Sequence, residues 1–494
     1  MKVFLMYPDR DFDAEQAPPW NAQALIQDLE LGVMLKTMAR QDDFLYQVAR
    51  TALLSPLTDP DLIRYRQDVL QDCLKNPDIV RAIYRLPIES IENQRKHWMG
   101  IFSRYPGGIL SSAVEMMRMF LMLLRRLRRI ADEQAPRFTS QGFTRFFAMI
   151  RRELDDDFFT EAEAHLGELK FRSGVLLGAD LGPGAEANRY ILRKTDRSQP
   201  WIKQIFSSKQ RECSFRLPPR DNAGARILSE IKDQGINQVA NALAQSTDHV
   251  DSFFEMLQTE LAFYIGAINL YDQLVGMGEP VAMPAPAVVS QRRHAFSGLY
   301  DVSLALTTGK KVVGNAIDAG EKEMIVITGA NQGGKSTFLR SIGQAQMMMQ
   351  SGLFVPAASF SANVCSGLAT HYRREEDASM ISGKLDEELG RMSAIIDHLG
   401  PGALVLFNES FAATNEREGS EIARQIVNAL LEKDIKIFFV THLYAFAREF
   451  HDQLPENVLF LRAERKADGA RTFKISEGEP LQTSFGEDLY RQIF

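Results

Sequence analysis

From Met324 to Thr337 the sequence reads MIVITGANQGGKST, an apolar run followed directly by a glycine-rich segment. The segment matches GxxxxGK[ST], and apolar residues at helical spacing follow it as far as Gly352. This order predicts a buried strand, a phosphate-binding loop (P-loop) and a helix in direct succession. The predicted loop consists of Gly329, Ala330, Asn331, Gln332, Gly333, Gly334, Lys335, Ser336 and Thr337.

The predicted loop has the chemistry to hold ATP with Mg²⁺. Its glycines allow successive backbone N–H groups to surround a phosphate, and the amino terminus of the helix adds a partial positive charge. Lys335 is expected to neutralise the β- and γ-phosphates, and the Ser336 hydroxyl to ligate Mg²⁺. The sequence therefore predicts an ATPase with ATP and Mg²⁺ as cofactors.

A second predicted strand, residues 403–407, ends at Asn408-Glu409. A carboxylate at the carboxyl end of such a strand can accept a proton from the attacking water, so Glu409 is the predicted general base. An aspartate normally precedes this glutamate and holds a Mg²⁺-bound water. Asn408 offers an amide oxygen for that water without the negative charge. We therefore expect weakened Mg²⁺ binding and slow hydrolysis.

A third predicted strand, residues 435–440, leads into Thr441-His442. A histidine at this position can reach a γ-phosphate oxygen or the attacking water, so His442 is a predicted catalytic residue. The alternative is a structural histidine. Between the last two strands lies the segment 410–416, in which Thr414 or Asn415 can cap the following helix.

The rest of the chain has the pattern of a second, largely helical domain. Apolar residues recur at helical spacing over about 20–169 and again over about 223–274. Between them, residues 171–216 show short strand patterns at 175–177, 190–192 and 214–216 around turns, which predicts a small β insertion. Glycines and prolines crowd into 276–286, where we place the domain boundary. The predicted fold is multidomain: an α-helical domain over 1–280, followed by an α/β P-loop ATPase domain over 285–494.

The composition indicates the class of protein and its expected cellular compartment. Of its 494 residues 45% are hydrophobic and 24% charged, which is typical of folded globular chains. Its three cysteines, Cys73, Cys213 and Cys365, are far apart, which argues against a disulfide framework or a CxxC zinc site. The amino-terminal apolar run is too short for a secretion signal, and the apolar stretch 116–124 is too short to span a bilayer. We expect a cytoplasmic protein without a membrane partner.

The charge distribution leaves nucleic-acid binding open. The net charge of −7 gives no general attraction to phosphate backbones, so contact with DNA would need a local basic patch. Arg125, Arg126, Arg128 and Arg129 cluster on one predicted helix. They form either a solvated helix face or a phosphate-contacting patch, and their partners in the fold distinguish the two.

Together these motifs resemble the MutS family of ABC-type ATPases, known for DNA mismatch repair. The resemblance rests on TGANQGGKST at 328–337, GLFVPA at 352–357 and Thr441-His442, and the valine-proline-alanine string is its most discriminating part. Asn315 matches the asparagine ahead of the family's first ATPase strand, and residues 63–70 resemble the start of its helical core. The resemblance implies a MutS-like core and lever domain over 1–280 and ATPase domains that dimerise.

Two segments bear on that implied dimer. In the family, a signature segment from the partner subunit completes each nucleotide site, and residues 377–389 match it here. Gly383 stands where the family has a phosphate-contacting serine, with Ser382 beside it. Segment 410–416 corresponds to the family's dimer-interface loop, so Thr414 and Asn415 are expected to face the partner subunit.

The leading hypothesis is an ATP-dependent DNA-binding protein of the MutS type. Mg-ATP binding and slow hydrolysis would drive closure of a homodimer around DNA, with branched DNA as a candidate substrate. Only about twenty residues precede the helical region, so we do not expect direct mismatch reading, and the β insertion would be a reduced clamp. The alternative is a nucleotide-gated protein-interaction module with weak or no ATPase activity and no DNA binding. Acidic net charge and Asn408 favour this alternative.

Overall fold

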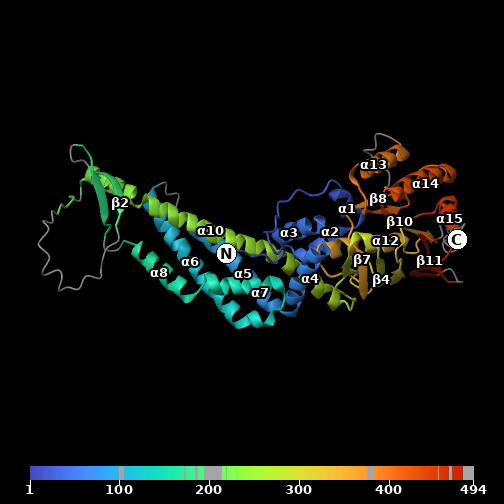
Figure 1. Cartoon of the computed structure of the whole chain (residues 1–494), viewed down its shortest axis with the longest axis horizontal. Coiled ribbons are helices and arrows are strands. Elements are labelled where there is room, and N and C mark those ends of the chain that lie inside the picture. Colours follow the sequence, from blue (N-terminus) through green and yellow to red (C-terminus); the bar gives the residue numbers. More distant parts are fainter. Residues whose placement is uncertain are drawn as a thin grey trace. The chain divides into compact units, whose positions relative to one another are not determined.

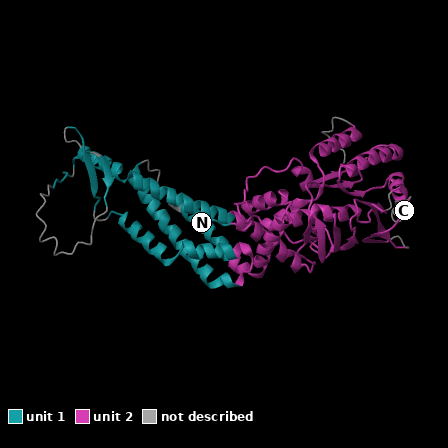
Figure 2. Ribbon diagram, in the orientation of Figure 1, with its two compact units in different colours: residues 1–3, 81–136, 144–258 teal, residues 4–80, 137–143, 259–494 magenta. Residues whose placement is uncertain are grey.

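The computed structural model describes residues 1–98, 105–171, 174–183, 187–193, 214–218, 220–374, 383–453, 456–466 and 470–481. The chain folds into two compact units, shown in different colours in Figure 2. Unit 1 comprises Met1–Val3, Arg81–Pro136 and Thr144–Gln258. Unit 2 comprises Phe4–Val80, Arg137–Phe143 and Thr259–Phe494.

Unit 1 is mainly helical, as the apolar spacing predicted. It draws on the helices α5 (Pro77–Trp98), α6 (Pro106–Gln134), α7 (Gln141–Glu153), α8 (Asp156–Glu168) and α10 (Asn222–Gly276), three of which cross the unit boundary. The apolar residues of α6 form a buried stripe, and Phe120 of α6 packs against Phe254 of α10 with ring centroids 5.8 Å apart. The apolar faces of these helices thus form the core of this unit.

Helix α6 is long and apolar enough to be considered as a membrane span by length and composition. Half of its most apolar window is nevertheless buried inside the protein. Phe120, Leu124 and Leu127 are at most 1% exposed. This is the packing of a core helix in a folded unit, as expected for the stretch 116–124.

The predicted β insertion is a two-stranded hairpin in unit 1. Strand β1 (Leu177–Leu181) pairs antiparallel with β2 (Ala187–Leu192). The prediction of a strand at 214–216 was wrong: residues 214–218 have no strand structure, and Phe215 is 84% exposed. A short segment with strand propensity becomes a strand only where a neighbouring strand pairs with it. Residues 194–213 lie outside the described residues.

Unit 2 combines helices with two sheets (Figure 1). Its helices, besides the shared ones, are α1 (Ala22–Asp28), α2 (Leu31–Ala39), α3 (Asp43–Leu54), α4 (Pro60–Lys75), α11 (Val302–Thr308), α12 (Lys335–Gln350), α13 (Lys384–His398), α14 (Glu416–Glu432) and α15 (Tyr444–Gln453). Its smaller sheet has the order β3-β7-β4-β5, from β3 (Ala285–Ala287), β4 (His294–Leu299), β5 (Asn315–Asp318) and β7 (Ser359–Asn363).

The larger sheet of unit 2 positions the P-loop. Its order is β12-β11-β6-β10-β9-β8, from β6 (Met324–Gly329), β8 (Leu368–Tyr372), β9 (Leu404–Asn408), β10 (Lys436–Val440), β11 (Val458–Arg465) and β12 (Arg471–Glu477). All neighbours pair in parallel except β11 and β12, which are antiparallel. Because the carboxyl ends of parallel strands share one edge, the loops after β6, β9 and β10 meet there.

The units divide the chain differently from the expected ranges 1–280 and 285–494. Residues 4–80 belong with the ATPase elements in unit 2. The Gln350 side chain at the end of α12 donates to the Leu57 carbonyl at 2.9 Å, and the Leu57 N–H donates to the Gln350 carbonyl at 2.8 Å. Gln344 of α12 likewise donates to the Leu29 carbonyl at 2.9 Å. Helical periodicity shows that a helix has an apolar face but not which element covers that face.

Candidate nucleotide-binding site

The loop between β6 and α12 adopts a backbone that its glycines make possible. Gly329 and Gly334 have φ values of 109° and 86°, in the left-handed region that favours glycine. A Cβ atom at Gly329 would lie 2.8 Å from the backbone nitrogen of Ala463 on β11, so no larger residue fits. The strand, loop and helix therefore follow one another as predicted, with the amino terminus of α12 directed at the loop.

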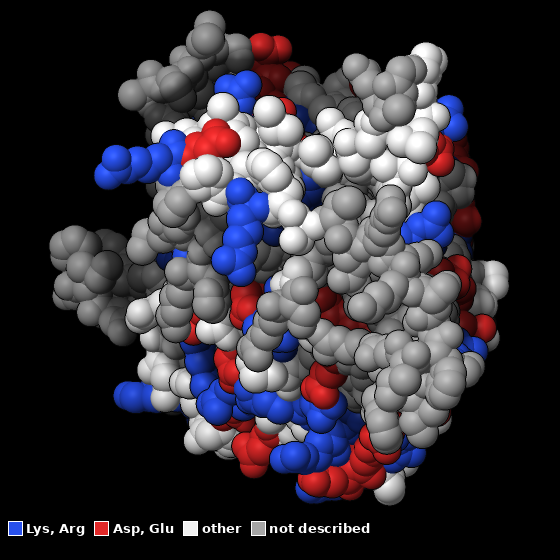
Figure 3. Space-filling view, turned by 90° about the vertical axis from the view of Figure 1, so that its left-hand side faces the viewer, with Lys and Arg blue, Asp and Glu red and all other residues white. Residues whose placement is uncertain are grey.

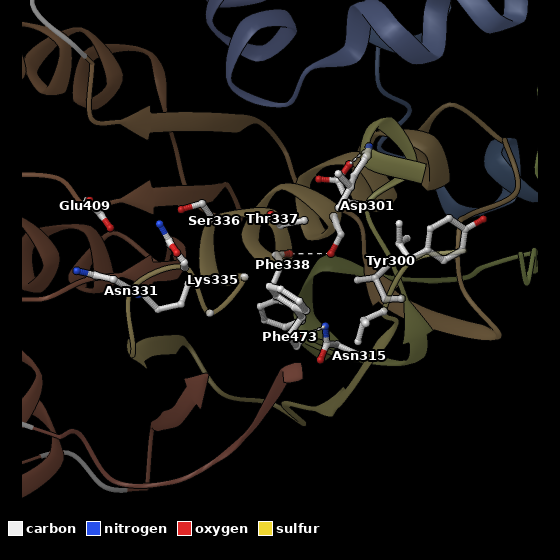
Figure 4. A pocket seen from close by; sticks show the side chains of 18 of the residues that line it. Tyr300, Asp301, Asn315, Asn331, Lys335, Ser336, Thr337, Phe338, Glu409 and Phe473 are labelled. Atoms are coloured by element: carbon white, nitrogen blue, oxygen red, sulfur yellow. Dashed lines mark hydrogen bonds between the residues drawn. The ribbon is translucent and has the colours of Figure 1, made fainter. Parts of the chain in front are cut away.

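A cavity of about 770 Å³ opens beside this loop, within the usual size range of ligand sites. Residues 331–337 of the loop line one part of it. Residues from distant parts of unit 2 complete the lining, among them Asn315, Arg373, Glu409, His442 and Phe473. Figure 4 shows Glu409, Lys335 and Ser336 at one end of the cavity, with Phe473 and Asn315 further along it.

Lys335 lies at the first position of α12 and is only 5% exposed. Its Nζ donates hydrogen bonds to the carbonyl oxygens of Gly329 and Ala330, each at 3.0 Å. Burial lowers the pKa of Lys335 to about 8, although the nearby Glu409 carboxylate opposes the change. A buried ammonium group with only neutral acceptors gains strongly from an entering phosphate, because the phosphate supplies the missing negative charge.

The two residues predicted to hold Mg²⁺ lie together. The Ser336 hydroxyl donates to Asn408 Oδ1 at 2.9 Å, from the first turn of α12 to the end of β9. Both groups present oxygen atoms, which fits a magnesium ion that is otherwise held by phosphate and water. Neither group is charged, so this pair attracts a cation less than a serine-aspartate pair would.

Glu409 lies beside His442 at the carboxyl ends of β9 and β10. His442 Nε2 is 2.9 Å from Glu409 Oε1, and Arg373 Nη1 at the end of β8 is 4.0 Å from Glu409 Oε2. The hydrogen bond from His442 is the largest influence on the pKa of Glu409 and holds it below its ordinary value. Glu409 is therefore ionised at neutral pH and able to accept a proton.

Arg373 and Phe473 line the cavity but carried no recognisable motif in the sequence. Arg373 follows β8, and its backbone N–H donates to the Asn408 carbonyl at 2.9 Å. Phe473 lies on β12, is 50% exposed, and has its ring next to Gly334. The strand pattern ahead of Arg373 could have indicated a residue at the same edge of the sheet. Phe473 gave no such signal, because it lies more than a hundred residues from the P-loop.

Asn315 is the first residue of β5 and connects this strand to β12. Its Nδ2 donates to the Phe473 carbonyl at 3.3 Å, and its Oδ1 accepts from the Ile475 N–H at 2.9 Å. Both ends of the amide thus hold the backbone of residues 473–475, in which Phe473 has a φ of 58°. This arrangement presents a flat aromatic ring to the cavity at a distance from Lys335, as a stacking surface for an adenine base would require.

Sequence models of known protein domains match two long segments of the chain. Residues 58–277 match the sequence model of the MutS2 N-terminal domain, and residues 325–489 match that of MutS domain V. The two matches together cover most of the chain and include the P-loop strand, Glu409 and His442. The chain belongs to the MutS family. The family resemblance inferred from the sequence motifs is thereby confirmed.

Individual relatives are distant and longer. The chain is 30% identical over 219 residues to the endonuclease MutS2 of Lacticaseibacillus casei, a match that covers 42% of this chain and 27% of the relative. It is 26% identical over 268 residues to the DNA mismatch repair protein MutS of Leptospira interrogans, covering 50% and 30%. Against MutS of a Synechococcus strain it is 24% identical over 485 residues, covering 87% and 54%. The chain thus spans about a quarter to about half of these relatives.

The segments expected at a MutS-type dimer interface are only partly described. Asp377 and Ser382 lie outside the described residues, and Gly383 precedes α13 as its N-cap residue. Asn415 is the N-cap of α14, with its Oδ1 accepting from the Glu418 N–H at 3.0 Å. The capping role considered for Asn415 is therefore present, and a contact of Thr414 or Asn415 with a partner subunit stays a prediction.

The arginines of α6 are mostly ion-paired within unit 1. The pairs are Arg125 with Glu163 at 2.9 Å, Arg126 with Glu89, and Arg128 with Asp132 at 2.9 Å. On the face shown in Figure 3, lysines and arginines lie among aspartates and glutamates. Separate carboxylate partners indicate a solvated, charge-balanced helix face, and a phosphate-binding role for this cluster loses its support.

We predict that Asn408→Asp strengthens Mg²⁺ binding. The added carboxylate stands next to the Ser336 hydroxyl and attracts the cation, by about 1–2 kcal/mol or roughly 5- to 30-fold. The measurement is the Mg²⁺ concentration that gives half-maximal ATP hydrolysis, which should fall. Asn428→Asp on α14 adds the same charge outside the cavity and serves as the control. An unchanged Mg²⁺ requirement in Asn408→Asp would exclude Asn408 from the metal site.

We also predict that Phe473→Ala weakens ATP binding by about 1–3 kcal/mol, the usual contribution of base stacking on an aromatic ring. Phe473→Trp should retain affinity, because it keeps a flat aromatic face. Binding is measured by calorimetry with ATP and, in parallel, with inorganic triphosphate. Triphosphate affinity should not change in Phe473→Ala, since that ligand has no base. Equal losses for both ligands would mean that the ring only supports the loop.

Proposed function

We propose that this chain is a MutS-type ATPase that binds Mg-ATP at the β6–α12 loop, hydrolyses it slowly, and couples this cycle to an action on DNA. One observation carries the enzymatic part of the proposal. Lys335, Ser336, Glu409 and His442 line one cavity at the ends of three neighbouring parallel strands, and Asn408 accepts a hydrogen bond from Ser336.

Each of these groups has a place in the proposed reaction. Backbone N–H groups of the loop and the Lys335 ammonium bind the β- and γ-phosphates, while the Phe473 ring holds the base. Mg²⁺, when bound at Ser336 and Asn408, supplies positive charge for the phosphate oxygens. Glu409 accepts the proton of a water that attacks the γ-phosphorus, and His442 orients the Glu409 carboxylate through its hydrogen bond.

Two features favour slow turnover. The neutral Asn408 holds the cation less strongly than a carboxylate, so less charge is neutralised in the transition state. Gly383 also stands where the family has its phosphate-contacting serine, which removes that hydroxyl from the proposed contact between subunits. Arg373, near Glu409 and at the edge of the cavity, provides a positive charge in the same chain that partly offsets these losses.

The DNA part of the proposal rests on the family. The Leptospira and Synechococcus relatives are named DNA mismatch repair proteins, and we propose a homodimer whose ATPase domains close around DNA. The ion pairs of α6 give this part no support, and they favour the second candidate function, a nucleotide-gated module that binds another protein. The net charge of −7 favours the second candidate as well.

The experiment that separates the two candidates is steady-state Mg-ATP hydrolysis during titration with linear and four-way-branched DNA. Lys335→Ala is the blank. We expect DNA to change wild-type turnover, more strongly for the structure that the protein prefers. Turnover that is the same with every DNA would refute the DNA coupling and support the protein-interaction function. Wild-type turnover no greater than that of the blank would refute hydrolysis at this site.

A further inference from the structure

We propose that Glu388 is a positioning residue of the ATPase, which holds the backbone next to Glu409 and so connects helix α13 to the catalytic carboxylate. This proposal rests on the proposed function and names a means of regulating the same site. Glu388 does not line the nucleotide cavity, so its role would be exerted through Glu409.

The backbone around the catalytic base is in an unusual conformation. Glu409 and Phe411 have φ values of 54° and 62°, in the left-handed region that non-glycine residues rarely adopt. Such a conformation persists only where surrounding contacts hold it, and it is common at catalytic sites. The direction in which the Glu409 carboxylate points therefore depends on whatever holds residues 409–411.

The backbone N–H of Glu409 donates to the Val440 carbonyl at 2.9 Å, and Glu388 makes a second contact through its side chain. Its Oε2 accepts a hydrogen bond from the Phe411 N–H at 2.9 Å, and the side chain is only 4% exposed. Burial raises the pKa of Glu388, while the bond from Phe411 and the positive charges of Arg391 and Arg373 lower it. An acceptor at this position is needed whatever its charge, because a buried N–H without one is unfavourable.

A second connection joins Glu388 to the same loop through its backbone. The Glu388 carbonyl is 3.0 Å from His371 Nε2, and the Ser410 hydroxyl is 2.7 Å from His371 Nδ1. Burial lowers the pKa of His371 to about 4, so the ring is neutral at physiological pH. The Ser410 hydroxyl donates to the His371 carbonyl oxygen at 2.6 Å, so Glu388 and Ser410 are both joined to His371.

Packing completes the enclosure of this loop. The Phe411 ring is fully buried and stacks on the His371 ring, with centroids 5.3 Å apart. On the other side, a Cβ atom at Gly419 of α14 would lie 2.3 Å from the Phe411 carbonyl oxygen, so the glycine permits a close approach. Residues 409–411 thus have little room to move unless α13 moves with them.

Helix α13 is well placed to transmit a change. Glu388 lies in its second turn, near the end of the segment 377–389 that matches the family's signature segment. Arg391, one turn later, donates to the Tyr372 carbonyl at the end of β8 at 3.0 Å. A shift of α13 would therefore change the backbone beside Glu409 while leaving the P-loop contacts of Lys335 and Ser336 in place. It would alter hydrolysis rather than ATP binding.

The test compares Glu388→Ala with Glu388→Gln and Glu387→Ala. Glu388→Ala leaves the Phe411 N–H without its acceptor, and we expect kcat to fall about tenfold or more with ATP affinity within about twofold of wild type. Glu388→Gln retains an oxygen acceptor and should restore most of the turnover. Glu387→Ala is the matched control, since Glu387 neighbours Glu388 but pairs with Arg391 at 3.4 Å.

Hydrogen exchange of the segment 405–415 provides a readout that does not depend on turnover. We expect faster exchange in this segment for Glu388→Ala, and wild-type exchange for Glu388→Gln and Glu387→Ala. Unchanged exchange in Glu388→Ala, or an equal loss of ATP affinity and turnover, would overturn the positioning role. If the wild type hydrolyses no more ATP than Lys335→Ala, the proposed ATPase function fails separately, and exchange alone decides whether Glu388 holds the loop.

Discussion

Glu409→Gln is expected to abolish measurable ATP hydrolysis and to leave ATP binding close to that of the wild type. A general base contributes about 10²- to 10⁴-fold to a rate, and glutamine cannot accept the proton of the attacking water. The substitution preserves size and leaves an oxygen for the hydrogen bond from His442 Nε2, so the cavity should keep its shape. The loss should therefore appear in kcat and not in the dissociation constant.

Single-turnover hydrolysis and calorimetric ATP binding measure these two quantities on the same preparation. Glu421→Gln is a suitable control because Glu421 is exposed on α14 and pairs with Arg424, outside the cavity. Turnover in Glu409→Gln equal to wild type would remove Glu409 from the role of base.

Because His442 holds the pKa of Glu409 below its ordinary value of 4.5, the base stays ionised across neutral pH. Protonation of this base should therefore reduce wild-type turnover only in clearly acidic solution.

Lys335→Ala is expected to weaken ATP binding by about 2–3 kcal/mol, roughly 30- to 150-fold, because it removes a charge-assisted contact to the phosphates. Folding stability should not fall comparably. In the free protein the buried ammonium is solvated only by the Gly329 and Ala330 carbonyls, and its lowered pKa shows that burial disfavours its charge. Binding is measured by calorimetry and stability by thermal unfolding, with Lys433→Ala, an exposed position after α14, as the control.

The pH dependence of ATP binding tests the same residue. With a pKa of about 8 in the free protein, Lys335 is charged below pH 8 and becomes neutral above it. ATP affinity of the wild type should therefore decrease as the pH rises through 8, while Lys335→Ala should lack this decrease. A wild-type affinity that is constant from pH 7 to pH 9.5 would mean that the Lys335 charge does not contribute to binding.

Local sequence patterns predicted the structure reliably where the candidate site residues lie close together in the sequence. The P-loop, its strand and its helix occur in the predicted order, and Asn408-Glu409 and Thr441-His442 follow buried strands. Parallel strands bring their carboxyl ends to one edge, so the predicted strands were enough to anticipate that these residues would meet. The strand predicted at 214–216 shows the opposite case, because no strand among the described residues pairs with this short segment.

Local sequence patterns gave little indication of contacts between segments that are far apart in the chain. Nothing around Phe473 distinguishes it from other phenylalanines in the sequence. Arg373 follows a strand pattern and Glu388 falls in the segment that matches the family's signature segment, but neither pattern indicates which residues they contact. The partners of the α6 arginines could not be foreseen either, since Glu163 and Glu89 lie 38 and 37 positions from the arginines they pair with.

By itself the sequence determined the proposed nucleotide chemistry: a loop suited to phosphates, a lysine and a hydroxyl proposed for ATP and its metal ion, a proposed base and a histidine. These depend on residue types at short spacing, which the covalent chain determines directly. Only the tertiary structure decided that residues 4–80 pack with the ATPase, that Phe473 and Arg373 join the cavity, and that Glu388 holds the loop beside Glu409. Those contacts form between segments far apart in the chain, and they depend on strand order and packing, which no local pattern specifies.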